Sequence, residues 1–392
     1  MKNFVHCVPT RFVFGKGTEQ QVGEQVRDFG GTKVLVVYGG GSAVRSGLID
    51  RVRKSLSDAG IDSLVLGGVQ PNPRDTLVYQ GIELVRREGV DFILAVGGGS
   101  VIDSGKAIAH GSCYDGDFWD FFCGKAKPER TLPFGVVLTM SAAGSESSNS
   151  CVITQDATKT KRGLRSELNR PRFAIMDPEL AMTLPPYQIA CGATDILAHI
   201  MERYFTSETE VDLIDRMAEG AMKAVIRATR IAVKDPRDYD AQAQLMWGST
   251  IAHNDTVGVG RTQDWGSHQI EHELSALYDV PHGAGLAVVM PAWMRYHMNK
   301  NVMRFAQYAV RVHGCEMDFE HPERTALRGI EAHEAFLREI GMPLTLKELG
   351  AKSEDIPAMA VKTKKNNPDG TTGGVFPMVP ADIEAILRIA DR

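Results

Sequence analysis

The chain has 392 residues, of which 43% are hydrophobic and 24% charged, and its formal net charge is −5. These values are typical of a soluble globular protein with two or three domains, at roughly 150 residues per domain. Acids and bases alternate without a basic patch, no segment approaches a membrane span, and the start lacks a signal peptide's apolar stretch, so we expect a cytoplasmic protein with no nucleic-acid or membrane partner.

In the first half of the chain, short apolar runs alternate with amphipathic stretches. The apolar runs predict strands at residues 33–38, 63–66, 91–96 and 135–138, and helical spacing predicts helices at residues 47–59 and 76–88. Such alternation is typical of a parallel, doubly wound sheet. Ligands of these sheets bind beyond the carboxyl ends of the strands.

The character of the chain changes after Asp177-Pro178, where β-branched runs become rare and helical patterns continue to the C-terminus. Pro185-Pro186 suits the first turn of a helix that continues to about Phe205. We therefore predict two domains: a Rossmann-like α/β dinucleotide-binding domain at residues 1–180 and an all-helical domain at residues 181–392.

Two glycine loops, Gly39-Gly40-Gly41-Ser42 and Gly97-Gly98-Gly99-Ser100, each follow a predicted strand and precede a helix. Without side chains, the backbone can approach a phosphate at a helix N-terminus. Neither loop is a GxGxxG fingerprint, and the second does not have the spacing of a P-loop. One such loop can be an ordinary tight turn, but two after parallel strands favour a nucleotide site.

The end of the first strand bears on the choice between NADH and NADPH. NAD-specific enzymes place an acid near this point, where it binds the ribose hydroxyls. Here Gly39, Gly40, Gly41 and Ser42 occupy the position, and Arg45 follows one turn later. The absence of an acid favours NADPH, with a solvated surface role as the alternative for Arg45.

A carboxylate and several histidines have the spacing of metal ligands. Asp195 and His199 lie four residues apart on a predicted helix, His268 and His272 repeat that spacing, and His282 follows ten residues later. One carboxylate with three imidazoles suits Fe²⁺ or Zn²⁺. Spacing alone also allows ordinary core or surface histidines.

Read together, the motifs resemble the iron-containing (type III) alcohol dehydrogenase family, and most closely its NADPH-dependent butanol dehydrogenase and broad-range aldehyde reductase branch. The resemblance extends along nearly the whole chain. It is carried by the two glycine loops and by Pro71-Asn72-Pro73, Gly144-Ser145-Glu146, Thr183-Leu184-Pro185-Pro186, Asp195-xxx-His199, Gln263-Asp264-Trp265, His268-xxx-His272 and Pro281-His282-Gly283.

The resemblance implies a fold similar to dehydroquinate synthase and roles for individual residues. It implies the metal ligands Asp195, His199, His268 and His282. It implies a pyrophosphate site at Gly98, Gly99 and Ser100, a 2′-phosphate site near Gly39, Gly40 and Ser42, and further cofactor contacts from Asn72, Asp103, Thr139, Ser145 and Lys161. Members of the family are often homodimers.

These expectations combine into an oxidoreductase that reversibly transfers a hydride between NADP(H) and an aldehyde or primary alcohol, assisted by Fe²⁺ or possibly by Zn²⁺. His272, one turn from His268, is our candidate for the proton relay, with an orienting role as the alternative. Two other classes stay open at this stage. They are a dehydroquinate-synthase-like lyase with a transient internal redox step, and a non-redox nucleotide-binding protein.

Overall fold

The computed structural model describes all of residues 1–392, which form two compact units. One unit comprises Cys7–Leu184, and the other comprises Pro185–Arg392 together with Met1–His6. The first residues join the helical unit through Lys2, whose backbone N donates to the Gly260 carbonyl at 2.8 Å. None of the helices combines the length with the apolar character that crossing a bilayer requires.

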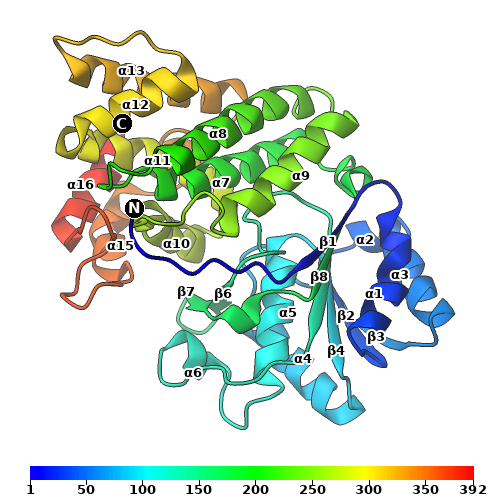
Figure 1. The fold of residues 1–392 in the computed structure, drawn as a ribbon. Coiled ribbons are helices and arrows are strands. Elements are labelled where there is room, and N and C mark those ends of the chain that lie inside the picture. Colours follow the sequence, from blue (N-terminus) through cyan, green and yellow to red (C-terminus); the bar gives the residue numbers. More distant parts are fainter. The chain divides into compact units, whose positions relative to one another are not determined.

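The α/β unit is built on a six-stranded parallel sheet with the order β1-β8-β5-β4-β2-β3, beside a β6-β7 antiparallel pair (Figure 1). Its strands are β1 (Arg11–Phe14), β2 (Lys33–Tyr38), β3 (Asp62–Leu66), β4 (Phe92–Gly97), β5 (Phe134–Leu138), β6 (Ser150–Gln155), β7 (Thr160–Arg165) and β8 (Phe173–Met176). Its helices are α1 (Val22–Asp28), α2 (Ser42–Arg45), α3 (Leu48–Asp58), α4 (Asp75–Glu88), α5 (Gly99–Gly111) and α6 (Trp119–Phe122).

Helices cover both faces of the sheet, as continuous apolar strands require. Val34 and Val36 of β2 share one core with α1 and α3. On the other face, Gly105 of α5 lies against Ile93 and Ala95 of β4, where an added Cβ would contact them at 3.5 and 3.4 Å. The two faces are served by alternate residues of each strand, because successive side chains of a strand point to opposite faces of the sheet. The predicted doubly wound sheet is confirmed.

The second unit consists of helices and their connections, which confirms the predicted all-helical C-terminal part. These helices are α7 (Pro186–Tyr204), α8 (Asp212–Ala232), α9 (Tyr239–His253), α10 (Gly266–Tyr278), α11 (His282–His297), α12 (Val302–His313), α13 (Pro322–Glu339), α14 (Leu346–Leu349), α15 (Ile356–Lys362) and α16 (Pro380–Ala390).

The helix α7 is the centre of this unit, with α8, α9 and α11 packed against it. Every residue from Ile189 to Tyr204 is buried, so this helix is surrounded on all sides. Polar side chains on such a helix are held in the interior and need partners there.

Candidate functional site

Two of the predicted metal ligands lie on α7. Asp195 and His199 are one turn apart, with exposures of only 4% and 3%. The His199 Nε2 lies 3.3 Å from the Asp195 Oδ1. The buried helix therefore holds a carboxylate and an imidazole side by side in the interior of the helical unit.

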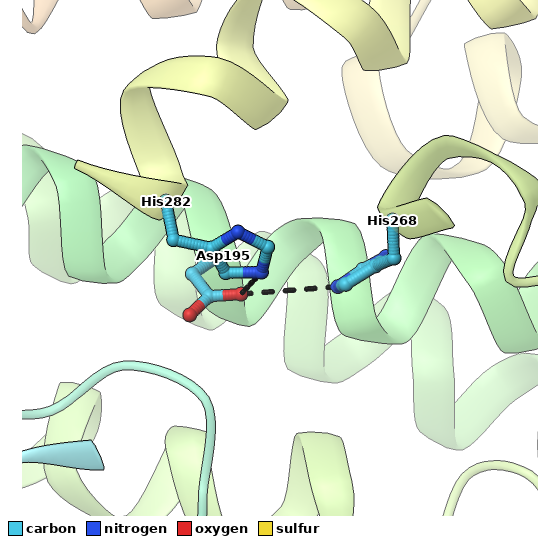
Figure 2. Close-up of side chains that lie close together, drawn as sticks. All are labelled: Asp195, His268 and His282. Carbon is cyan, nitrogen blue, oxygen red and sulfur yellow. Dashed lines mark ion pairs between the residues drawn. The ribbon is translucent and has the colours of Figure 1, made fainter. Parts of the chain in front are cut away.

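The helices α10 and α11 bring two further imidazoles to Asp195. His268 lies in the first turn of α10, and His282 is the first residue of α11. Figure 2 shows both rings beside the Asp195 carboxylate, and the Nε2 of each lies 3.9 Å from its Oδ1. The His199 and His268 ring centroids are 4.5 Å apart. The structure thus gathers all four residues that the resemblance implied as ligands.

The gathered donor atoms fit a divalent cation. The ligand atoms of Asp195, His268 and His282 all lie within 4.8 Å of one another. The Asp195 Oδ1 and the His268 Nε2 are buried and make no hydrogen bond. Buried polar atoms without partners are costly, and a shared cation would satisfy both. Carboxylate and imidazole donors suit Fe²⁺ or Zn²⁺.

The Nδ1 atoms of two of these histidines contact buried glutamates. The His268 Nδ1 lies 3.0 Å from the Glu202 Oε1, and the His282 Nδ1 pairs with the Glu271 carboxylate. Neither glutamate was among the residues predicted from the sequence. The available signal is a repeated His-x-x-Glu spacing, since Glu202 follows His199 and Glu271 follows His268 by three residues.

The Glu202 carboxylate also affects a second acid. Burial, with the charge of Glu202 adding to it, raises the pKa of Asp264 to about 7. Asp264 accepts hydrogen bonds from the backbone N–H groups of Gly266, Val375 and Phe376 at 2.8–2.9 Å. These bonds fix the loop that leads into α10 and hence the position of its first turn.

His272, the candidate proton relay, lies beside His282 rather than among the Asp195 contacts. Its ring centroid is 5.7 Å from that of His282, and the residue is 8% exposed. Together with Glu271 and His282, it forms a second group whose donor atoms are mutually within 4.8 Å. The residue is therefore a neighbour of one candidate ligand.

Two aromatic rings border His199: Trp265, which belongs to the Gln263-Asp264-Trp265 motif, and His253, which no sequence motif includes. The His253 ring at the end of α9 lies 4.1 Å from the His199 ring, and the Trp265 ring lies 5.4 Å from it. The Arg203 guanidinium stacks over Trp265 at 4.6 Å. Nothing in the spacing of His253 pointed to this contact, which depends on how α9 packs against α7.

In the α/β unit, the two glycine loops follow the neighbouring parallel strands β2 and β4. A Cβ built on Gly40 or on Gly99 meets no atom within 4 Å, so the backbone is open at both loops. At Gly97 an added Cβ would lie 2.5 Å from Val101, so only glycine fits there. Gly98 is the N-cap residue of α5, so the second loop leads directly into a helix N-terminus, where the first N–H groups have no acceptor from a preceding turn. This arrangement can bind phosphate groups.

Asp103 and Ser145 meet in a buried network around a lysine that our sequence analysis missed. The Ser145 Oγ donates to the Asp103 Oδ1 at 2.6 Å. The fully buried Lys106 Nζ donates to the Ser145 carbonyl oxygen and hydroxyl at 2.7 and 2.9 Å. Burial raises the pKa of Asp103 and lowers the pKa of Lys106. Their proximity counteracts both shifts, because each charge stabilises the other.

The remaining predicted cofactor residues fall into two contacts in the same unit. The Lys161 Nζ of β7 donates to the Oδ1 of Asn72 at 3.0 Å, and both residues are buried. Asn72 has a φ of 53°, a conformation that asparagine tolerates better than most residues. Thr139 follows β5, and its N–H donates to the Gly97 carbonyl at 3.1 Å. A cofactor role for these residues stays a prediction.

Comparison with known proteins identifies the class of enzyme. The model described as iron-containing alcohol dehydrogenase matches residues 9–178. The model described as Fe-containing alcohol dehydrogenase family, C-terminal, matches residues 189–390. The chain therefore belongs to the iron-containing alcohol dehydrogenase family, a family of oxidoreductases, and the predicted family is confirmed.

Individual relatives match along nearly their whole length. The chain is 40% identical to the probable NADH-dependent butanol dehydrogenase 1 of Bacillus subtilis over 388 residues, 99% of each chain. It is 36% identical to the NADPH-dependent aldehyde reductase YqhD of Escherichia coli over 369 residues, 93% of this chain and 94% of that one. The solved structure of NADH-dependent butanol dehydrogenase A from Thermotoga maritima has a TM-score of 0.96 at 41% identity, covering 100% of this chain and 99% of that one.

Proposed function

We propose that the protein reversibly transfers a hydride between NADP(H) and an aldehyde or primary alcohol of short to medium length, with Fe²⁺ or Zn²⁺ held in the helical unit. The observation that carries this proposal is the convergence of Asp195, His268 and His282 on one point. The butanol dehydrogenase and aldehyde reductase names of the relatives support the substrate class.

Asp195, His199, His268 and His282 are the proposed ligands. They would hold a divalent cation, which would supply Lewis-acid stabilisation of the negative charge that develops on the substrate oxygen. Asp195 supplies the only charge among the four, and its burial keeps water from weakening its attraction for a cation. The three imidazoles supply neutral nitrogen donors, which leaves one positive charge to act on the substrate.

NADPH is the proposed cofactor, although the relatives include enzymes named for each nicotinamide. The loop that contains Gly39, Gly40 and Ser42 has no acidic residue, so no carboxylate there repels a 2′-phosphate. The exposed Arg45 folds back over this loop, since a Cβ on Gly41 would lie 2.5 Å from its Nη1. An arginine at this point favours a phosphate.

His272 is proposed to pass the substrate proton to solvent at one of its imidazole nitrogens. Its ring is close to His282 without being part of the Asp195 group, and a neutral imidazole has one nitrogen that accepts a proton and one that donates a proton. The His272→Ala variant is expected to bind metal normally and to lose about 10²–10⁴-fold in turnover. Full turnover in this variant would remove the residue from the mechanism.

One assay tests the proposal as a whole. The full chain, reconstituted separately with Fe²⁺ under anaerobic conditions or with Zn²⁺, is mixed with butanal and either NADPH or NADH. We expect consumption of NADPH that His268→Ala abolishes. Turnover that persists in this variant would contradict the proposed metal site.

A matched pair of arginine variants tests the cofactor preference. Arg45→Ala is expected to raise KM for NADPH about 10- to 100-fold and to leave KM for NADH unchanged, because a single charged hydrogen bond contributes about 1.5–3 kcal/mol. Arg53→Ala, a change at another exposed arginine, which lies on α3, is the control. Equal effects of Arg45→Ala on the two cofactors would contradict the proposed 2′-phosphate contact.

A further inference from the structure

Two buried carboxylates contact the imidazoles of His268 and His282 on the side of each ring that faces away from Asp195. Glu202 and Glu271 are 1% and 0% exposed. The Glu202 Oε1 lies 3.0 Å from the His268 Nδ1, and the Glu271 Oε2 pairs with the His282 Nδ1. In both rings the opposite nitrogen, Nε2, lies 3.9 Å from the Asp195 Oδ1. Each ring therefore lies between a glutamate and the shared aspartate.

This arrangement determines the tautomer of each imidazole. A carboxylate accepts hydrogen bonds and donates none, so the ring nitrogen that faces it carries the proton. For His268 and His282 that nitrogen is Nδ1, which leaves the Nε2 lone pair directed at the Asp195 group. A neutral imidazole with this lone pair is the form that binds a cation.

We propose that Glu202 and Glu271 are positioning residues, which fix the ring orientation and tautomer of His268 and His282 and strengthen both as metal ligands. The proposal rests on the metal role proposed above for these histidines. Carboxylates hydrogen-bonded to the second nitrogen of a ligating imidazole orient the ring and raise its basicity.

Glu202 is held rigidly enough for this role. Besides the His268 ring, it accepts hydrogen bonds from the Trp265 backbone N–H at 2.6 Å, the Ser267 hydroxyl at 2.6 Å and the His268 backbone N–H at 3.2 Å. These are donors at the N-terminus of α10, which have no partner within the helix. One side chain of α7 therefore anchors both the start of α10 and the ring that the helix carries.

Glu271 is fixed by different neighbours. The Ser275 hydroxyl donates to its Oε1, one turn further along α10. Its side chain occupies the space over Gly285 of α11, where an added Cβ would lie 2.6 Å from Oε1 and 2.7 Å from Cγ. Glycine inside a helix costs about 1 kcal/mol relative to alanine. Here the missing Cβ is what allows the carboxylate to reach His282.

Direct coordination by Glu271 is the competing role, because Glu271, His272 and His282 also form a group of possible ligands. The contact between Glu271 and the His282 Nδ1 favours the positioning role, since it directs one carboxylate oxygen at a ring N–H. The other oxygen accepts from Ser275. The two roles predict different spectra for a bound Co²⁺ ion, which the following experiment uses.

The experiment measures Co²⁺ and Zn²⁺ binding to the full chain. Zn²⁺ affinity is determined by competition with a chelator, and the Co²⁺ visible spectrum reports on coordination. Glu271→Gln keeps an oxygen for His282 and an amide for Ser275 but removes the charge. We expect both Glu271→Gln and Glu202→Gln to bind Zn²⁺ about 10- to 100-fold more weakly. The Co²⁺ band positions should remain close to those of the wild type, because the ligand atoms are unchanged.

Glu219→Gln is the matched control. Glu219 is a buried carboxylate of α8 that accepts from the Tyr204 hydroxyl at 2.8 Å and from Gln307 at 2.9 Å, and it contacts no histidine ring. Its replacement is expected to alter thermal stability and to leave Zn²⁺ affinity within about twofold of the wild type. An equal loss of affinity in the control would show general damage to the unit and overturn the proposal.

Failure of this proposal is distinguishable from failure of the proposed function. Unchanged affinity in both glutamate variants, with binding lost in His268→Ala, would overturn the positioning role and leave the metal site standing. A Co²⁺ spectrum in Glu271→Gln with the signature of a lost oxygen ligand would make Glu271 a ligand instead. Wild-type binding that survives His268→Ala would overturn both proposals.

Discussion

Replacing Lys106 by methionine is expected to destabilise the α/β unit by about 3 kcal/mol. The Lys106 Nζ donates to the carbonyl oxygens of Ser145 and Ser150, each at 2.7 Å, and to both oxygens of Ser148 at 3.2 and 3.3 Å. Methionine fills the volume of the side-chain stem but satisfies none of these acceptors. Losing the two short bonds leaves two carbonyl oxygens without this donor, at about 1–3 kcal/mol each. Removal of the buried Lys106 charge offsets part of this cost, although Asp103 loses the neighbouring charge that stabilises it.

The assay combines urea unfolding with hydrogen exchange of the amides at residues 144–150. If the change leaves the loop at residues 144–150 ordered in only about a tenth of the molecules, and if Ser145 contacts the cofactor, the apparent affinity for NADPH would fall about tenfold. The exposed Lys125, which lies 3.6 Å from Asp120, provides the control. Its change to methionine is expected to shift stability by less than about 0.5 kcal/mol. Unchanged unfolding and exchange in Lys106→Met would refute the reasoning.

Three further changes have defined outcomes. Burial lowers the pKa of His297 to about 3, and its ring nitrogens are buried without hydrogen bonds. The neutral ring therefore contributes stability that is fully present above about pH 6.5 and is lost as pH falls toward 3. His297→Phe should reduce this loss, measured by urea unfolding, by up to roughly 1.4 kcal/mol per pH unit. Gly285→Ala should weaken Zn²⁺ binding in a chelator competition about tenfold by displacing Glu271, and unchanged affinity would show that the helix adjusts freely. Asp215→Asn should cost about 3–5 kcal/mol in thermal unfolding, because the buried Arg261 guanidinium at 2.8 Å loses its neutralising charge, and a loss below about 1 kcal/mol would contradict this.

The sequence predicted the parts of the fold that depend on local patterns. The run from Lys33 to Tyr38 is apolar and ends in glycines, and the strand β2 has these bounds. The strand β1 at Arg11–Phe14 was missed because it is short, only partly buried and lies at the sheet edge. Its existence depends on pairing with β8 at Phe173–Met176, about 160 residues away, which no local pattern encodes.

In the candidate site, too, residues identified by local spacing were predictable, and contacts between distant parts of the chain were not. Asp195 and His199 were predictable because a four-residue spacing places both on one helix face. Glu202 also follows His199 by three residues, but its contact with His268 was not predictable, because His268 lies 66 residues further along the chain. Lys106 was missed for another reason: lysine is almost never fully buried, so composition rules place it at the surface. The roles of all these residues stay predictions until variants are measured.

If the proposed cation binds at Asp195 and His199, the helix α7, which is buried from Ile189 to Tyr204, links folding of the helical unit to the supply of that cation. With Asp195 and His199 in its interior, any ion that binds the folded form alone raises the free energy of unfolding by mass action, by about 2.7 kcal/mol at a concentration one hundred times Kd. A cell starved of the metal would then hold enzyme that is shorter-lived as well as inactive, since the open chain is what proteases cut. The steady-state amount of the protein would follow metal availability without any dedicated sensor.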